Sequence, residues 1–456
     1  MSTQKHGYCT LCRSRCGTIN TVHNDTLVRV DPDTSHPTGS AMCTKGRAAP
    51  ELVHSPHRIL HPMRRTTPKG SPDPGWEPIT WDQALDEIAD KFGKIREESG
   101  AEAVAFGVTT PSGTPLSDSI DWIERFVRAF GSPNIAYGTE VCNWHKDYAH
   151  MFTFGCGIPV ADYPNADLIL LWGHNPTNTW LAQANAIGEG RRAGARLVVV
   201  DPRRTALAAE ADAWLQVRPG TDAALALGLA NLLLSTGRYD HAFVRDWTNA
   251  PLLVRADTGR FLRAGDIWAD AEKPDAWVAW DLESMQPVPY DTRRHGCAQG
   301  AASFASQGEY VVEIDGRPTV CHTVLEKLAQ RCSIYSPAHV EAITGVAESS
   351  LRAAANLIAQ SSSIAYHSWS GVAQSTNATQ TDRAIAVLYA LTGSFDTPGG
   401  NRIYPKQPTN PVNGLDLIPM AQRSKALGLK ERPLGPPAMG WVTARDLYQA
   451  ILTATP

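Results

Sequence analysis

Four cysteines near the N-terminus have a spacing that could bind a metal centre. Cys9, Cys12 and Cys16 lie within one short loop, in "YCTLCRSRCG", and Cys43 follows in "AMCTKG". The spacing is C-x2-C-x3-C-x26-C. A [4Fe–4S] cluster needs four thiolate ligands, which a compact loop with three cysteines and one distant cysteine can provide. The spacing therefore favours an iron–sulfur cluster.

Two other interpretations of these cysteines are weaker. A structural zinc site usually takes its ligands from two separated pairs, so three cysteines in eight residues and a distant fourth suit zinc poorly. Buried structural thiols do not usually crowd into a polar loop flanked by glycine and arginine. Lys45, two residues after Cys43, could stabilise the charge of a reduced cluster or link it to a second cofactor, and it could equally be a surface lysine.

The composition describes a folded protein with little affinity for polyanions. The chain has 456 residues, enough for about two to four domains, of which 43% are hydrophobic and 19% charged. The net charge of −4 gives no reason to expect binding to nucleic acid or to an anionic membrane surface, because such partners are usually met by clustered positive charge. Small molecules and proteins are the expected partners.

The N-terminal sequence MSTQKHGYCT has neither an apolar core nor twin arginines before the first cysteine motif. No stretch reaches the roughly 20 uninterrupted apolar residues that span a bilayer, and the nearest, "ALALGLANLLL" from Ala224, is typical of a buried helix. We therefore expect a cytoplasmic protein without direct membrane insertion. In that reducing compartment the nine cysteines, an odd number, should stay as thiols or bind metal.

The elements after the cysteine motif alternate between strand and helix. A Pro/Gly-rich linker or hairpin is expected over 62–78, and a helix from Trp81, with Asp82 in its first turn. Its apolar residues recur at helical spacing: Ala84, Leu85, Ile88, Ala89, Phe92 and Ile95. "AEAVAFGV" from Ala101 is typical of a buried strand, and "SDSIDWIERFVRAFGS" of a helix that ends at Gly131.

The middle of the chain predicts a parallel sheet with a nucleotide site. "ADLILLWGHNP" and "ARLVVVDPRRT" are apolar strands separated by the helix "WLAQANAIGEGRRAG". Ligands of such sheets bind at the carboxyl ends of the strands, here at 173–178 and 201–204. No G-x-G-x-x-G follows either strand, which disfavours NAD. Asp222, in "RPGTDAALALG", begins a helix, where its carboxylate could cap the helix or bind a guanine edge.

Six motifs in this order resemble the molybdopterin oxidoreductases of the dimethyl sulfoxide reductase type. They are C-x2-C-x3-C-x26-C-x-K, "WDQALDEIA", "WGHNP", "DPRRT…AD…W", "PGTDAALALG" and "LTGSFDTPGG", and the match runs from about residue 7 to the end of the chain. The resemblance implies one [4Fe–4S] cluster and a bis-molybdopterin guanine dinucleotide cofactor, in which two dinucleotides hold one molybdenum or tungsten atom.

The resemblance also implies roles for particular residues. Cys9, Cys12, Cys16 and Cys43 match the cluster ligands, and Lys45 matches the lysine between cluster and pterin. Five residues match one dinucleotide site: Asn175, Asn178, Asp201, Arg203 and Asp222. Asp222 is then a guanine-binding residue. Gly371 and Gln374 match a turn that contributes to pterin and second-nucleotide binding, although an ordinary loop before a helix would look the same.

A protein ligand for the heavy metal is expected at Cys142, in "TEVCNWHKDYAHMFTFGCG". The family has cysteine, selenocysteine, serine or aspartate at the matching position. A thiolate is a soft donor that suits a sulfur-rich metal centre, and the alternative is a buried structural cysteine. His145 lies three residues later, within one helical turn, where it could transfer protons near the metal or simply pack beside it. Cys142, His145 and Lys45 are therefore the candidate catalytic residues.

These expectations give an α/β multidomain fold. A small [4Fe–4S] domain is expected over 1–62, an α/β domain contributing to the second dinucleotide site over 63–138 and 346–456, and a Rossmann-like α/β dinucleotide-binding domain over 139–345. Short strands with turns at 257–259 and 315–316 predict a β-rich insert at about 250–345. Relatives usually continue into a C-terminal barrel-like domain that covers the dinucleotides, so we expect a second polypeptide to supply it, or the chain to be a fragment.

The expected function is two-electron oxidation or reduction of a small-molecule substrate at a bis-pterin molybdenum or tungsten centre. Electrons would pass through the [4Fe–4S] cluster to an electron-transfer protein or to an iron–sulfur or flavin subunit. One alternative is a hydratase like acetylene hydratase, a member of the same family that adds water at tungsten without net redox. Another is an electron-transfer subunit with the cluster but no pterin, against which Cys142, Asp201 and Asp222 argue.

Overall fold

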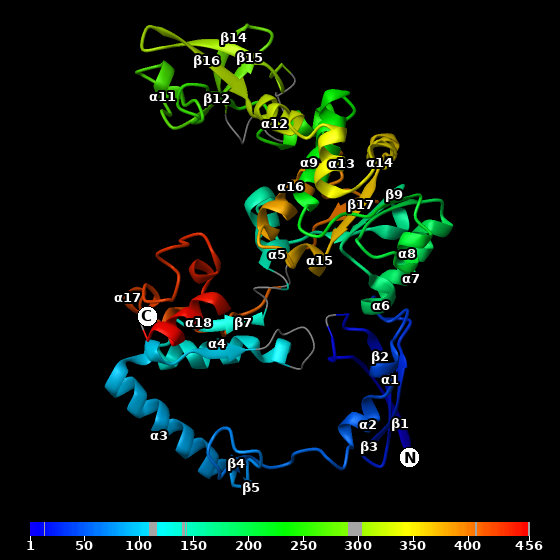
Figure 1. Cartoon of the computed structure of the whole chain (residues 1–456), viewed down its shortest axis with the longest axis vertical. Coiled ribbons are helices and arrows are strands. Elements are labelled where there is room, and N and C mark those ends of the chain that lie inside the picture. Colours follow the sequence, from blue (N-terminus) through cyan, green and yellow to red (C-terminus); the bar gives the residue numbers. More distant parts are fainter. Residues whose placement is uncertain are drawn as a thin grey trace. The chain divides into compact units, whose positions relative to one another are not determined.

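The computed structural model describes residues 1–12, 14–108, 116–138, 142, 144–290, 303–405 and 408–454; side chains at 116–118 and 145–147 are outside this description. The chain divides into two compact units, which we describe separately. Unit 1 comprises Met1–Cys142, Asn178–Asn185 and Lys406–Pro456, and unit 2 comprises Asn143–Thr177 and Ala186–Pro405. Figure 1 labels the elements of both units along the chain.

Unit 1 begins with a three-stranded antiparallel sheet, β1 (Ser2–Tyr8), β2 (Gly17–His23) and β3 (Thr26–Pro32), in that order. Asn24 and Asp25 both have positive φ, 45° and 60°, as the two central residues of a tight hairpin turn require. The loop with the first three cysteines joins β1 to β2. Two short helices follow β3: α1 (Thr44–Arg47) and α2 (Ala49–Val53).

The rest of unit 1 is a small α/β arrangement. The segment expected as a linker or hairpin is a hairpin of β4 (Met63–Arg65) and β5 (Trp76–Pro78). The helix expected from Trp81 is α3 (Trp81–Ser99), which a capping box of Thr80 and Gln83 begins. The strand β6 (Phe106–Val108) pairs in parallel with β7 (Ile135–Tyr137), and α4 (Leu116–Phe130) lies between them in sequence. Phe92 of α3 packs 5.7 Å from the Phe106 ring. The C-terminal elements are η4 (Leu415–Leu417), α17 (Met420–Arg423), η5 (Pro436–Met439) and α18 (Ala444–Thr453).

Unit 2 is built on the predicted parallel sheet. Its order is β11 (Ala213–Leu215), β10 (Arg196–Val200), β9 (Leu168–Trp172) and β17 (Ile364–Ser368), with every pair parallel. Strand β17, far along the chain, lies beside β9 on the side opposite β10. The order of the strands therefore changes direction between β9 and β17, which is where ligands of open α/β sheets bind.

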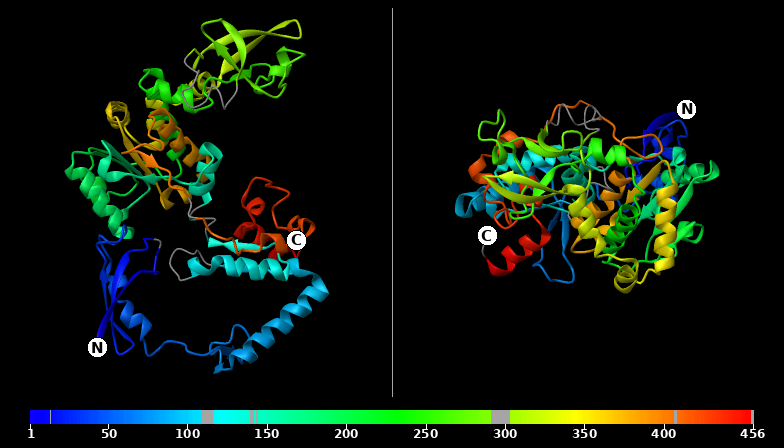
Figure 2. Two further views of the ribbon diagram at one scale, coloured as in Figure 1. Left: turned by 180° about the vertical axis from the view of Figure 1, so that it is seen from behind. Right: turned by 90° about the horizontal axis from the view of Figure 1, so that it is seen from above.

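Both faces of this sheet are covered, as the continuous apolar strands require. Leu168, Leu170 and Trp172 face one core, shared with α9 (Asp222–Ser235), α14 (Glu348–Gln360) and α16 (Ala378–Leu391). Ile169 and Leu171 face a second core, to which α7 (Leu181–Arg192) and α8 (Ala206–Ala209) contribute. In Figure 2 the helices of the first core are green (α9) and yellow to orange (α14 and α16), and the orange strand β17 lies in the same sheet as green strands.

The predicted β-rich insert is a separate small body within unit 2. Strands β12 (Leu253–Arg255), β16 (Arg317–Thr323) and β15 (Glu309–Ile314) form one antiparallel sheet, and β13 (Trp277–Asp281) and β14 (Gln286–Tyr290) form a hairpin. Asp315 and Gly316 have positive φ at the turn between β15 and β16, as predicted. Cys321 is buried in the core of the insert, while Cys332 of α12 is buried in the core of the main sheet.

Shorter elements complete unit 2, although Asn178 and Thr179 at the end of α6 belong to unit 1. They are α5 (Trp144–Phe154), β8 (Val160–Ala161), η3 (Tyr163–Asn165), α6 (Pro176–Thr179), α10 (His241–Trp247), α11 (Ala264–Ile267), α12 (Val324–Ser333), α13 (Pro337–Thr344), α15 (Ser370–Ala373) and β18 (Asn401–Arg402). Among the described residues, no helix has both the length and the apolar character needed to cross a membrane.

The turns after β9 and β17 meet backbone to backbone. Gly371 N donates to Gly173 O at 3.1 Å, and Trp369 N donates to Trp172 O at 3.0 Å. A Cβ added at Gly371 would lie 2.7 Å from Gly173 Cα and 2.9 Å from Gly173 O. Gly173 also has a positive φ of 58°. Both positions therefore need glycine for the sheet to close at this edge.

We expect Gly371→Ala to destabilise unit 2 by about 1 to 3 kcal/mol, because the new Cβ meets backbone that cannot move aside. Thermal and urea unfolding would measure the loss. Gly188→Ala is the matched control, since Gly188 lies inside α7 and its added Cβ would meet only the flexible Arg192 side chain at 3.5 Å. That variant should be as stable as the wild type or more so. Equal destabilisation by both substitutions would contradict the explanation.

Candidate functional site

Three of the N-terminal cysteines lie in the loop between β1 and β2, and the fourth lies at the start of α1. Cys9 N donates to Cys16 O at 2.8 Å, which closes the loop between β1 and β2. Cys16 is buried against Val30 and Met42. Cys43 is the N-cap of α1, and the buried Gly46 of that helix brings its backbone close to the Cys9 sulfur, which an added Cβ would approach to 3.5 Å.

The four thiols lie close enough together for their charges to interact. Burial raises the pKa of Cys16 to about 11, and the charges of Cys12, Cys9 and Cys43 add to the effect. Burial likewise raises the pKa of Cys9, with further contributions from Cys12 and Cys43. Metal ligation requires thiolates, so binding at this loop releases protons.

The donor set fits a cluster better than a single ion. Within the described ranges, no group of three or more His, Cys, Asp or Glu side chains is arranged to hold one metal ion. Four thiols that lie near one another can provide one ligand to each of the four irons of a [4Fe–4S] cluster. Lys45 lies exposed on α1, two residues after Cys43.

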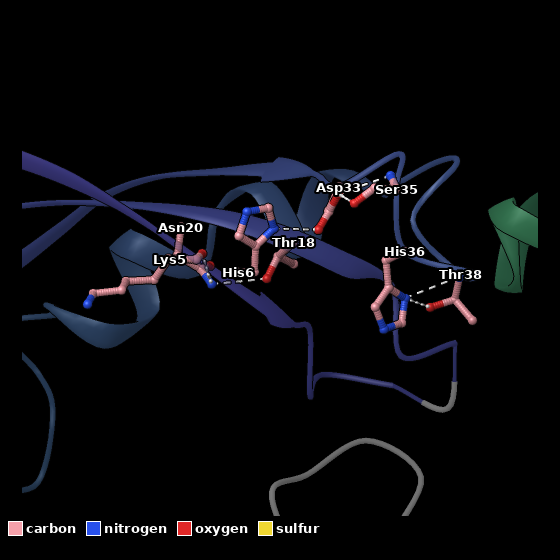
Figure 3. A network of polar contacts seen from close by, with 8 residues as sticks. All are labelled: Lys5, His6, Thr18, Asn20, Asp33, Ser35, His36 and Thr38. Carbon is pink, nitrogen blue, oxygen red and sulfur yellow. Dashed lines mark hydrogen bonds and ion pairs between the residues drawn. The ribbon is translucent and has the colours of Figure 1, made fainter.

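A polar network that the sequence did not predict organises the loop between β3 and Cys43, and Figure 3 shows its contacts. One further bond of Thr38 joins this loop to the cysteine loop. The imidazole of His36 packs on Gly17, where an added Cβ would lie 2.2 Å from the His36 Cβ. Thr38 Oγ1 donates to Arg15 O at 2.5 Å and lies 3.0 Å from His36 Nδ1.

Asp33 anchors the start of the same loop. Its carboxylate accepts a hydrogen bond from Ser35 Oγ at 2.6 Å and lies 2.7 Å from His6 Nδ1. These hydrogen bonds, that of Ser35 first, lower the pKa of Asp33 to about 2. The signal in the sequence was "DPDTSHPTG", in which aspartate, serine and proline after a strand are typical of side-chain-stabilised turns.

The predicted nucleotide residues Asp201 and Asp222 lie together at the carboxyl edge of the unit 2 sheet. Asp201 directly follows β10, and its Oδ1 accepts from Arg203 N at 2.8 Å. Asp222 is the first residue of α9, and its Oδ1 accepts from the indole Nε1 of Trp172, the last residue of β9, at 2.7 Å. The Arg203 side chain is exposed beside them.

The environment of Asp222 favours its neutral form. Burial raises its pKa, and the nearby Asp201 carboxylate raises it further, while the Trp172 indole and backbone N–H groups act in the opposite direction. An acceptor that is buried and close to another carboxylate gains most from a ligand that supplies N–H donors, such as the edge of a guanine. As a buried hydrogen-bond acceptor, Asp222 therefore fits the guanine end of the expected cofactor.

The remaining predicted nucleotide residues lie on the turns. Asn175 Oδ1 accepts from Thr177 Oγ1 at 2.8 Å in the turn after β9. Gly371 is on α15 and Gln374 is its exposed C-cap, whose Nε2 donates to Ser370 O at 3.2 Å. The structure thus brings the Asn175 turn and the Gly371 turn together through Gly173. Asn178 is exposed on α6 and falls within unit 1.

The predicted metal ligand Cys142 precedes α5 by two residues and is partly buried. Its neighbour His145 lies on α5, but its side chain is outside the described part of the chain. The role of Cys142 and that of His145 stay predictions. Cys156 is partly buried after α5, and Cys297 is outside the described residues.

Two family comparisons agree with this geometry. The chain matches the family "Molybdopterin oxidoreductase" over residues 58–431 and the "Molybdopterin oxidoreductase Fe4S4 domain" over residues 3–55. The second match contains the four cysteines, and the first contains the sheet edge with Asp201 and Asp222. The chain belongs to the molybdopterin oxidoreductase family, as its motifs predicted.

Individual relatives differ in their reactions. The chain is 34% identical to acetylene hydratase from Syntrophotalea acetylenica over 54% of this chain and 34% of that protein. It is 27% identical to a sulfite dehydrogenase subunit from Allochromatium vinosum over 91% of this chain and 46% of the relative. The solved acetylene hydratase from Pelobacter acetylenicus superposes with a TM-score of 0.68 and 25% identity, covering 93% of this chain and 49% of the other. The chain spans about half the length of these relatives or less.

We expect Asp222→Asn to leave the cofactor-free protein as stable at pH 7 as the wild type, or more so. The pKa of folded Asp222 lies above its unfolded value, so the ionised carboxylate weakens folding above that pKa. Below about pH 3 the carboxyl group is mostly protonated in both the folded and the unfolded state, and the advantage of asparagine should disappear. Thermal unfolding between pH 3 and 8 would measure this. A loss of stability at pH 7 that is absent at pH 3 would contradict it.

Proposed function

We propose that the chain provides the iron–sulfur and metal-binding part of a molybdenum- or tungsten-dependent oxidoreductase that carries out two-electron oxidation or reduction of a small molecule. The observation that carries the proposal is the proximity of Asp201 and Asp222 at the carboxyl ends of β10 and β9, in a chain that also has the four-cysteine loop. A subunit that only transferred electrons would need the cysteines but not this edge.

The cysteine loop would hold a [4Fe–4S] cluster through Cys9, Cys12, Cys16 and Cys43. The buried position of Cys16 and the network around Asp33 keep the loop in place. Lys45, exposed on α1 two residues after Cys43, would assist electron transfer between the pterin and the cluster. The cluster would pass electrons one at a time to an electron-transfer protein, or to an iron–sulfur or flavin subunit.

The sheet edge of unit 2 would hold one dinucleotide. Asp222 would accept the N–H groups of the guanine, with the Trp172 indole fixing its carboxylate, and the exposed Arg203 would contact phosphate. Asn175 and Asn178 would contribute polar contacts along the same dinucleotide. The turn with Gly371 and Gln374 would contact pterin and the second dinucleotide.

The metal would be held by Cys142 in addition to the pterin sulfurs. A thiolate is the soft ligand that such a metal prefers. The bis-molybdopterin guanine dinucleotide would supply the two-electron chemistry. His145 would take up or release protons beside it, because imidazole titrates near neutral pH.

A second candidate is hydration without net electron transfer. It is favoured by the 34% identity to acetylene hydratase and by the structural likeness to the solved enzyme. The two candidates use the same cofactors, so composition does not separate them. Turnover with no electron acceptor present would identify a hydratase, while dependence on an artificial acceptor or donor dye would identify an oxidoreductase.

We expect Cys142→Ala to abolish turnover, with a loss of more than about 100-fold, because even residues that only support a metal ligand often cost 10- to 100-fold. The full chain, purified without oxygen, should contain about four irons and one molybdenum or tungsten by mass spectrometry. The variant should keep its iron and show less heavy metal or an altered metal spectrum.

Cys156→Ala is the control for this variant, since Cys156 is also partly buried and lies at the other end of α5. It should keep the wild-type content of iron and heavy metal. Iron without heavy metal in the wild-type chain would leave an electron carrier as the explanation. Zinc in place of iron would overturn the cluster.

A further inference from the structure

A fully buried polar network links three elements of unit 2. His150 on α5 places its Nδ1 at 3.3 Å from Asp382 Oδ2 on α16. Ser368, the last residue of β17, donates from its Oγ to Asp382 Oδ1 at 2.6 Å. All three side chains have no measurable exposure to solvent. One carboxylate therefore joins a histidine and a hydroxyl from two other elements.

Apolar and aromatic side chains enclose this network. The His150 ring lies 5.6 Å from Tyr389 and 6.0 Å from Phe154, and Tyr389 stacks on Tyr366 at 4.3 Å. A carboxylate in such surroundings is costly unless it is paired, and a well-packed apolar group often serves stability equally well or better. Stability alone gives no reason to have Asp382 here.

His150 and Ser368, the two residues that contact Asp382, are close in sequence to predicted cofactor residues. His150 is the seventh residue of α5, about 9 Å along the helix axis from Trp144, and only Asn143 separates Trp144 from Cys142. Ser368 directly precedes the turn in which Trp369 N donates to Trp172 O and Gly371 meets Gly173. The Asp382 carboxylate thus contacts both α5, which follows Cys142, and the end of β17, which precedes the turn with Gly371 and Gln374.

We propose that His150, Asp382 and Ser368 are positioning residues for the metal centre. They set the rotation of α5 against α16, and so the position of the helix that begins two residues after Cys142. The hydrogen bond from Ser368 Oγ fixes the direction of the Asp382 carboxylate, and His150 of α5 contacts its other oxygen, whereas purely apolar packing would allow α5 to slide or turn along α16. The inference rests on the proposed function, because it takes Cys142 as the metal ligand.

Two variants separate positioning from stability. Asp382→Asn keeps the shape of the side chain but removes its charge. The double variant His150→Phe with Asp382→Leu replaces the pair by apolar groups of similar size, which should recover thermal stability. Asp246→Asn is the control, because Asp246 is also a buried carboxylate, but its bonded partner is the adjacent Arg245 on α10.

The measurements are thermal unfolding, iron and heavy-metal content, and the electron paramagnetic resonance spectrum of the partly reduced heavy metal, all on the full chain with its cofactors. We expect Asp382→Asn and the double variant to shift the metal spectrum and to reduce heavy-metal retention by about 10-fold. Their iron content should stay at the wild-type value. The double variant should unfold near the wild-type temperature, and Asp246→Asn should keep the wild-type spectrum.

Two results would overturn the inference while the proposed function stands: a wild-type metal spectrum and content in the double variant, or the same spectral shift in Asp246→Asn. Absence of heavy metal from the wild-type chain would instead overturn the proposed function, and the positioning role with it. A folded double variant with altered metal and unchanged iron supports the inference.

Discussion

The closest approach between the turns after β9 and β17 governs the arrangement of unit 2. Gly173 and Gly371 touch through their backbones, so these two strands end at one level and their turns form one surface. Asp222 is bonded to Trp172, the residue before Gly173, and Asp201 follows the neighbouring strand β10, so both lie near this contact. Because neither Gly173 nor Gly371 has room for a side chain, the two turns stay in backbone contact at this edge of the sheet.

Local sequence patterns predicted most of the elements but not the pairing between distant ones. The run from Leu168 to Trp172 and the helix from Asp222 were evident from apolar periodicity and turn residues. The place of β17 beside β9 was not predicted, because nothing in "IAYHS" specifies a partner almost 200 residues earlier. The Asp382 network was missed for the same reason: its three residues are unrelated in sequence and acquire meaning only where their elements meet.

The candidate site divides in the same way. The cysteines and Asp201 could be predicted because their chemistry depends on residue type and on position after a strand. The Trp172 indole bonded to Asp222, and the Asp33 loop over the cysteines, depend on orientation, which a one-dimensional pattern does not encode. Asp222 belongs to both groups. Its position at the start of a helix could be predicted from the sequence, but the burial that raises the pKa of its carboxyl group could not.

The insert of unit 2 enters and leaves the main body at almost one point. Leu253 of β12 pairs with Thr323 of β16, and Val324 N donates to Leu252 O at 3.0 Å. The insert has its own core, with Leu262, Val278 and Ile314 among its buried residues. Because the start of β12 and the end of β16 are paired, the distance between the two connections to the main body does not depend on the length of the chain between them. The insert can therefore be replaced or lengthened during evolution, which changes the surface of the protein, without a shift of α12 and the helices that follow it.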